Sequence, residues 1–403
     1  IKRILLIVPK SAMMQWQQEL KEHFNENFFI YDSDFITGMA RTFASFDAEE
    51  ELNFWKQHNQ IIVSLDALKP VSQRQGWSQE KINEYNKYRI ESVVGADFDM
   101  IIIDECHRSI YGNWRKVLDY FSSAKMIGLT ATPAPETLAF FNNNRIVNYT
   151  LEKSIADGVN VDYRVYRIKT QATEDGGAIR EGEKVKKITR YTGTVENIKN
   201  QDEITYTKTE LNRDIVNPAQ IKLVLETYRD AVYTEMFTDP QREPNMDYLP
   251  KTLIFALNDA HASNIVKIAK EVFGRFDDKF VQKITYSAGD SNELIRQFRN
   301  DKDFRIAVTV TLVATGTDVR PLEVVLFMND VKSDVLYTQM KGRGCRTITD
   351  DKLKEITPNA NTKECFYIVD AVGVTESDKT IPHPGKPGVR EKTSGQQLST
   401  RVS

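Results

Sequence analysis

Short runs of consecutive apolar residues recur along this chain, and many of their side chains are β-branched. They lie at Ile4–Val8, Ile61–Val63, Met100–Ile103, Met126–Leu129, Thr252–Phe255, Ile306–Val310, Val324–Phe327 and Phe366–Val369. A strand that is apolar along its whole length is typical of a parallel sheet whose two faces are both covered. These runs therefore predict buried parallel strands.

Amphipathic helical patterns lie between several of the runs. After Ser11, a candidate N-cap, apolar residues recur at helical spacing from Met13 to Phe24. A second predicted helix begins at Asn217-Pro218, and a third ends at Gly274. Strands that alternate with helices predict an α/β fold, and a length of 403 residues predicts two or three domains.

Polar and charged sequence separates the strands into two groups. We expect a first parallel-sheet domain at residues 1–145, a connector with a small β excursion at 146–215, a second parallel-sheet domain at 216–374 and a linker or tail at 375–403. The connector is rich in charged residues, and its one clear strand-like alternation is Val161–Ile168. The tail is rich in proline, glycine, serine and lysine, which is typical of a linker.

The composition limits where the protein acts and what it can bind. The net charge is only −3, so any surface that binds nucleic acid has to be a local groove. The three cysteines are far apart in the sequence and form no metal-ligand pair, which fits a reducing cytosol. No apolar run is long enough to cross a membrane. We therefore expect a cytoplasmic protein with no membrane partner.

Two adjacent carboxylates follow the predicted strand at Met100–Ile103. Asp104 can hold Mg²⁺, usually through water. Glu105 can orient or deprotonate the water that attacks the γ-phosphate of ATP. The alternative is that the two acids begin a helix, where the helix dipole favours negative charge. The string Asp104-Glu105-Cys106-His107 does not decide between these interpretations by itself.

Two further polar strings follow predicted strands. Thr130 and Thr132 stand in Thr-Ala-Thr-Pro, and their hydroxyls can hydrogen-bond the loop that carries Asp104 and Glu105; the alternative is an ordinary turn. The string Ala314–Asp318 contains Gly316, which permits close approach of the backbone to a ligand.

A fourth string, Gln339-x-x-Gly-Arg343-x-x-Arg346, lies on a predicted helix in the second domain. Arginines three residues apart share one face of a helix. From a second domain they can neutralise charge on a transferred phosphoryl group; the alternative is a solvated basic face. All four strings stand at strand or helix ends and in one order, and this joint match favours a nucleotide site over four unrelated turns.

With these strings in place, the chain resembles the helicases and translocases of superfamily 2. From Asp104 to about Glu376 it closely resembles the motor subunit of type I restriction enzymes. The strings that carry this resemblance are DECHRSIYGNWRKVLDYF, GLTATPAPETLAFFNNN, DGVNVDYRVYRIKT, ELNRDIVNPAQI, KTLIFALNDAHA, RIAVTVTLVATGTDVRPLE, QMKGRGCRT and IVDAVGVTE. Residues 1–103 also resemble Swi/Snf-type translocases, through LLIVPKSAMMQWQQEL and VSLDALKP.

The resemblance implies two RecA-like domains in tandem, with ATP and Mg²⁺ as cofactors and double-stranded DNA as the partner. It matches Asp104 and Glu105 to the Walker B pair. It matches His107, Thr130 and Thr132 to the residues that couple hydrolysis to DNA movement, and Gly316 and Asp318 to the loop that contacts nucleotide and DNA. It matches Gln339, Arg343 and Arg346 to the residues that contact the ATP phosphates. The residues matched to DNA contacts are Pro9, Lys10, Ser64 and Thr315.

The family's phosphate-binding loop, Gly-x-x-x-x-Gly-Lys-Ser/Thr, does not occur in these 403 residues. We therefore expect a first domain that is incomplete at its N-terminus, in a fragment of a longer protein that is inactive alone. The resemblance implies ATP-driven movement of DNA by the full protein, as part of a type I site-specific deoxyribonuclease with methyltransferase and specificity subunits. The alternatives are a Swi/Snf-like remodeller or helicase, and a non-catalytic scaffold that binds nucleic acid.

Overall fold

The computed structural model describes most of the chain. The described residues are 1–44, 53–68, 71–108, 112–119, 121, 123–168, 177–179, 184–188, 195–199, 204–206, 215–216, 218–285, 291–311 and 318–377. They fall into two compact units, one within Ile1–Val147 and the other within Asn148–Ile381.

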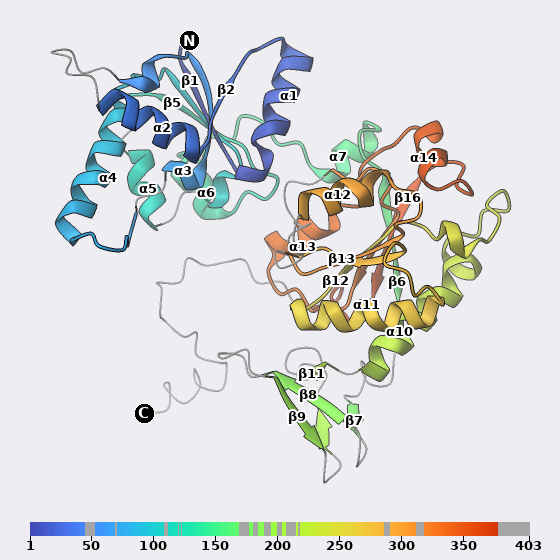
Figure 1. The fold of residues 1–403 in the computed structure, drawn as a ribbon. Coiled ribbons are helices and arrows are strands. Elements are labelled where there is room, and N and C mark those ends of the chain that lie inside the picture. Colours follow the sequence, from blue (N-terminus) through green and yellow to red (C-terminus); the bar gives the residue numbers. More distant parts are fainter. Residues whose placement is uncertain are drawn as a thin grey trace, which may run out of the picture. The chain divides into compact units, whose positions relative to one another are not determined.

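The first unit is built on a five-stranded parallel sheet (Figure 1). Its strand order is β2 (Phe29–Tyr31), β3 (Gln60–Ser64), β1 (Ile4–Val8), β4 (Met100–Ile103) and β5 (Lys125–Gly128). Since all five strands run the same way, their carboxyl ends meet at one edge of the sheet. The first two of the four polar strings in the sequence begin at this edge.

Both faces of the first sheet are covered, as the continuous apolarity of its strands predicts. Leu6 and Val8 of β1 pack with α1 (Met13–Phe24) on one face. Leu5 and Ile7 face the opposite way and share a core with the remaining helices. These helices are α2 (Ser33–Ala44), α3 (Leu65–Leu68), α4 (Gln79–Val94), α5 (Gly112–Asp119) and α6 (Pro135–Phe140).

The second unit is built on a six-stranded parallel sheet. Its order is β13 (Val281–Lys283), β14 (Ile306–Thr309), β12 (Thr252–Phe255), β15 (Val324–Phe327), β16 (Cys365–Asp370) and β6 (Asp162–Arg167). Its helices are α7 (Leu151–Ala156), α10 (Pro218–Ala231), α11 (Asp259–Phe273), α12 (Ser291–Asn300), α13 (Asp334–Lys341) and α14 (Asp350–Ile356). Helices α10 and α11 lie side by side (Figure 1). One apolar core joins α10, α11, α12 and α13 to the sheet.

The predicted fold class, two parallel-sheet α/β domains, is confirmed. Every strand that was predicted from an apolar run is present. The two strands of the parallel sheets that the sequence pattern missed, β2 and β13, have three residues each and lie at sheet edges, where burial is less complete. The predicted end of the third helix at Gly274 is correct, because this glycine adopts φ +63°, the left-handed conformation that ends helices.

Two local predictions are wrong. Ser11 does not cap α1, because residues Lys10–Ala12 form a short 3-10 turn and Ala12 takes the N-cap position. Residues 146–215 are also more than a connector, since α7 and β6 belong to the second unit. Strand β6 pairs in parallel with β16 over its whole length. This pairing supplies hydrogen-bond partners to the backbone of β16, which would otherwise be an open edge strand.

The remainder of the predicted connector contains short antiparallel strands. Strand β7 (Gly177–Ile179) pairs with β10 (Ile204–Tyr206). Strand β8 (Lys184–Ile188) pairs with β9 (Val195–Lys199) and β11 (Ile215–Val216). Among the helices that the structure describes, none is long and apolar enough to span a membrane.

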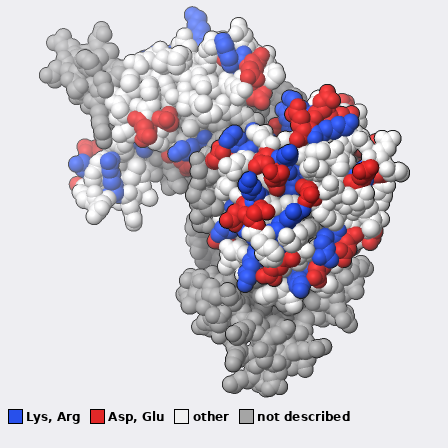
Figure 2. All heavy atoms as spheres, turned by 45° about the vertical axis from the view of Figure 1, so that its right-hand side comes forward, with Lys and Arg blue, Asp and Glu red and all other residues white. Residues whose placement is uncertain are grey.

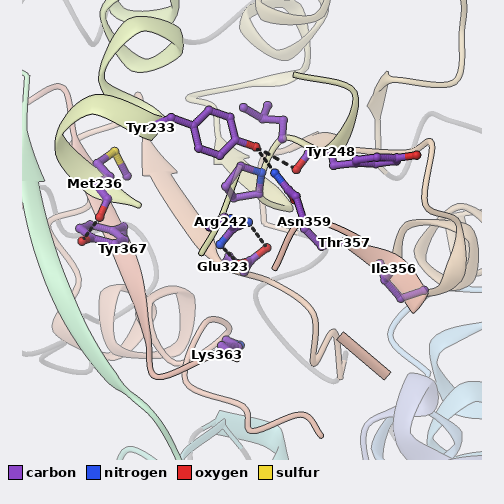
Figure 3. A network of polar contacts seen from close by, with 12 residues as sticks. Tyr233, Met236, Arg242, Tyr248, Glu323, Ile356, Thr357, Asn359, Lys363 and Tyr367 are labelled. Carbon is purple, nitrogen blue, oxygen red and sulfur yellow. Dashed lines mark hydrogen bonds and ion pairs between the residues drawn. The ribbon is translucent and has the colours of Figure 1, made fainter. Parts of the chain in front are cut away.

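Charged side chains are buried inside the second unit (Figure 3). Arg242 and Glu323 form a bidentate pair, with Nη1–Oε1 and Nη2–Oε2 distances of 2.7 and 3.3 Å. Lys251 Nζ donates to three backbone carbonyls, at 2.5 to 2.7 Å. The Arg305 guanidinium donates to three carbonyls and to the Thr357 hydroxyl. These contacts tie strand ends to the neighbouring loops and, among the described residues, give partners to most of the buried donors, Arg242 Nε excepted.

Candidate functional site

The carboxylate of Asp104 is held at the carboxyl edge of the first sheet. The Asp104 backbone N donates to the Ile7 carbonyl at 2.9 Å, which extends the pairing of β1 and β4 by one residue. Its Oδ1 accepts from the Glu105 backbone N at 2.9 Å, and its Oδ2 accepts from the indole Nε1 of Trp16 at 2.8 Å. With one donor on each oxygen, the Asp104 carboxylate has a defined orientation.

The backbone turns tightly at Glu105, two residues after the end of β4. Glu105 has φ +52°, in the left-handed region that side-chain-bearing residues rarely adopt. The next residue, Cys106, is buried, and its backbone N donates to the Leu129 carbonyl at 3.0 Å. Burial, and after it the charges of Glu105 and Asp104, raise the pKa of Cys106 to about 12. Cys106 is therefore a neutral thiol that anchors the turn.

His107 brings the two polar strings of the first unit together. Its Nδ1 lies 2.9 Å from Thr130 Oγ1 and 3.2 Å from Glu105 Oε2. Thr130 Oγ1 also accepts from the Thr132 backbone N at 3.1 Å. The prediction that the hydroxyls after β5 hydrogen-bond the loop after β4 is confirmed for Thr130 and is wrong for Thr132. Thr132 Oγ1 is buried and has no hydrogen-bond partner within the described part of the chain.

This cluster offers oxygen ligands for a hard cation but no complete metal site. Among the described residues, no group of three or more His, Cys, Asp and Glu side chains could hold a metal ion. Mg²⁺ in phosphoryl-transfer sites uses one or two carboxylates and takes its other ligands from phosphate and water. The oriented carboxylate of Asp104 fits that requirement.

The residues predicted to contact DNA in the first unit lie at the same sheet edge. Pro9 and Lys10 directly follow β1, and Ser64 ends β3, where it pairs with Val8. Lys10 is exposed. Ser64 is buried, and its Oγ accepts from the Ala67 backbone N at 3.1 Å. The Ser64 hydroxyl is thus engaged in the turn into α3.

In the second unit, the Asp318 carboxylate lies close to two arginine side chains. Its Oδ2 accepts from Arg320 Nε at 2.9 Å, and its Oδ1 lies 3.8 Å from Arg346 Nε. The other two residues predicted for this loop, Thr315 and Gly316, lie outside the described residues. Asp318 and Arg346 belong to different sequence strings, and the fold brings them within ion-pair distance.

The helix predicted to carry Arg343 and Arg346 ends before it reaches them. Helix α13 stops at Lys341, and Gly342 is its C-cap. The chain then passes closely over β16, where a Cβ on Gly344 would lie 2.1 Å from Phe366. The residues after Gly344 are held by residues 159–161. The Val161 backbone N donates to the Cys345 carbonyl at 2.7 Å, and Arg346 forms a β-bridge with Asn160. The prediction that Arg343 and Arg346 share one face of a helix is therefore wrong, and tertiary contacts position the two arginines instead.

Lys363 supports this arrangement and was missed by the sequence analysis. It is buried, and its Nζ donates to the carbonyls of Arg320 and Arg346 at 2.8 and 2.7 Å. Burial lowers the pKa of Lys363 to about 8. No periodicity or motif marks this lysine in the sequence, because its partners are backbone carbonyls on two distant segments.

On the face of the second unit that Figure 2 shows, charge does not single out a binding region. Figure 2 shows Lys and Arg interspersed with Asp and Glu over the visible face of this unit. An interspersed surface gives little long-range attraction for DNA.

Comparison with known protein families gives a match over the first third of the chain. Residues 1–135 match the family described as "Type III restriction enzyme, res subunit". Two curated relatives come from Escherichia coli. The EcoKI endonuclease subunit of a type I restriction enzyme (strain K12) is 28% identical over 341 residues, covering 76% of this chain. The EcoAI endonuclease subunit is 31% identical over 276 residues, covering 65% of this chain.

The chain spans 27% and 31% of the lengths of these two relatives. Among solved structures, a fragment of a putative HsdR subunit of a type I restriction enzyme from Vibrio vulnificus YJ016 has a similar fold. The TM-score is 0.53 at 19% sequence identity, and the match covers 92% of this chain and 53% of that one.

Proposed function

Because this chain is a superfamily 2 helicase-like motor related to the endonuclease subunits of type I restriction enzymes, we propose that it moves double-stranded DNA by hydrolysing ATP. The observation that carries the proposal is the hydrogen-bonded cluster of Asp104, Glu105, His107 and Thr130 at the carboxyl edge of the first sheet. Open α/β sheets bind their ligands at this edge.

Within the cluster, each side chain has a proposed role. Asp104 holds Mg²⁺ through water, and the ion neutralises charge on the phosphates when it is bound. Glu105 orients the attacking water and accepts its proton. His107 links Glu105 to Thr130 and Thr132, so that a change at the phosphates reaches the loop after β5.

In the second unit, we propose that Gln339, Arg343 and Arg346 act on the ATP phosphates and that Gly316 and Asp318 belong to the loop that contacts nucleotide and DNA. The ion pair with Asp318 supports the role of Arg346, because it restrains a half-exposed side chain. Proposed DNA contacts are Pro9, Lys10, Ser64 and Thr315. Methyltransferase and specificity subunits are the proposed protein partners.

The proposal is tested on the full-length protein. Glu105→Gln keeps size and hydrogen bonding but removes the base, so DNA-stimulated ATP hydrolysis should fall by about 10²–10⁴-fold while ATP still binds. Arg346→Ala should lower turnover by about 10²–10³-fold, because it removes stabilisation of the transition-state charge. Arg320→Ala is the matched control, since Arg320 also contacts Asp318 but lies outside the proposed phosphate-binding set.

Wild-type turnover in the Glu105→Gln protein would contradict the proposed site in the first unit. Equal turnover in the Arg346→Ala and Arg320→Ala proteins, with DNA binding unchanged, would show that Arg346 is ordinary surface. We further propose that residues 1–403 alone hydrolyse ATP negligibly, because this sequence contains no phosphate-binding loop to hold the β- and γ-phosphates. DNA-stimulated turnover of about 1 s⁻¹ by residues 1–403 would contradict this.

A further inference from the structure

Trp16 joins a helix of the first unit to the carboxylate of Asp104. The two residues are 88 positions apart, and the indole Nε1 lies 2.8 Å from Asp104 Oδ2. Trp16 stands on α1, one helical turn after the Lys10–Ala12 segment. Among the described residues, Trp16 is the only one whose side chain donates a hydrogen bond to this carboxylate.

Filling space explains the ring of Trp16 but not its N–H group. The ring packs beside the apolar cluster of Leu6, Val8 and Met13, where a phenylalanine or leucine would also remove apolar surface from water. A partly buried indole N–H needs an acceptor, and here the acceptor is the proposed magnesium-holding carboxylate. The position of the donor is therefore specific to Asp104.

The chemistry of the donor also suits a carboxylate that has to receive a cation. An arginine or lysine at this place would neutralise Asp104 and compete with Mg²⁺ for its oxygens. The neutral indole orients the carboxylate and leaves its charge in place. A hydrogen bond to an ionised acceptor is among the stronger ones in proteins, so a single neutral donor is enough to restrain the side chain.

Helix α1 is anchored in a way that keeps this donor in place. Gln17, the neighbour of Trp16, donates through Nε2 to the Phe28 carbonyl at 2.7 Å, which ties the helix to the chain entering β2. Asn25 ends the helix in the left-handed conformation, with φ 54°. Binding groups held in advance by such contacts lose little freedom when a ligand arrives.

We infer that Trp16 is a positioning residue that fixes the Asp104 carboxylate for the magnesium ion of ATP hydrolysis. The inference rests on the proposed function of Asp104. Trp16 itself touches neither the nucleotide nor the reacting atoms in this proposal; it acts through Asp104.

The contact can be tested without any activity, on residues 1–403 labelled with ¹⁵N-tryptophan. The chain has four tryptophans, so the spectrum has four indole N–H signals, and Trp16→Phe identifies the one that belongs to Trp16. In the Asp104→Asn protein the Trp16 signal should move upfield, because the hydrogen bond to an ionised acceptor is lost, while the other three stay in place. An unmoved Trp16 signal would overturn the inference. If Trp16→Phe does not fold, replacing the other tryptophans identifies the signal.

The positioning role is tested on the full-length protein through its magnesium requirement. In Trp16→Phe, the Mg²⁺ concentration for half-maximal DNA-stimulated ATP hydrolysis should rise about 10-fold, as expected for the loss of one hydrogen bond to a charged group. Trp55→Phe is the control, because Trp55 is buried in the same unit but belongs to the core on the opposite face of the sheet. Its magnesium requirement should match the wild type.

An equal magnesium requirement in the Trp16→Phe and Trp55→Phe proteins would show that Trp16 only fills the core. If the wild-type protein lacks DNA-stimulated hydrolysis, the proposed function fails instead, and the indole spectrum still decides whether Trp16 holds Asp104.

Discussion

Glu323 is the carboxylate that balances the buried positive charge of the second unit, and Glu323→Gln should strongly destabilise this unit. The glutamine keeps the size of the side chain but removes the charge that faces Arg242 (Figure 3). Burial tends to lower the pKa of Arg305 and of Lys363, and the charge of Glu323 is the largest influence that raises both. One substitution therefore removes the largest favourable charge acting on several buried cations.

The expected magnitude follows from burial. The side chains of Arg242 and Glu323 are 5% and 1% exposed, so water cannot replace the lost partner. Removing one member of a buried ion pair typically costs about 3–5 kcal/mol. In a domain of about 230 residues each kcal/mol shifts the melting temperature by about 2–4 °C. We therefore expect the melting temperature of the second unit to fall by roughly 6–20 °C.

Urea denaturation of residues 1–403 provides the measurement, with hydrogen exchange of the β15 amides as a reporter that belongs to the second unit alone. The matched control is Glu376→Gln, since Glu376 pairs with Arg167 at 3.4 Å on the exposed surface. An exposed pair contributes about 0–1 kcal/mol. If Glu323→Gln lowers the free energy of unfolding by no more than Glu376→Gln does, the reasoning about the buried charges is refuted.

Two further predictions concern the second unit. Burial lowers the pKa of His261 to about 4, and its Nδ1 accepts from the Leu257 backbone N at 3.2 Å. Since the unfolded chain binds a proton more readily, the free energy of unfolding should drop by up to about 3 kcal/mol as the pH falls from about 6.5 to about 4. Denaturation at several pH values should show that the free energy of unfolding of His261→Gln depends less steeply on pH than that of the wild type. An equally steep dependence would contradict this. Gly344→Ala should cost about 1–3 kcal/mol by overpacking against Phe366. Gly342→Ala, whose nearest atom is 3.2 Å away, is the control, and equal costs for the two would refute the clash.

The sequence by itself determined the fold class and which two polar strings meet in the first unit. Continuous apolar runs such as Met100–Ile103 are confirmed as parallel strands, because burial on both faces requires that pattern. The carboxyl ends of adjacent parallel strands share one edge, so the strings after β4 and β5 had to meet there. The bond between His107 and Thr130 is the result.

The tertiary structure alone decided where several other residues lie. The hydrogen bond of Trp16 to Asp104 spans 88 residues, and the bonds of Lys363 end on backbone carbonyls, which any residue supplies. The place of β6 beside β16 and the end of α13 before Arg343 depend on long-range pairing and on close packing at Gly344. A local pattern records the periodicity and burial of its own segment. It does not record which distant segment supplies the partner, and for these residues the partner decides the position.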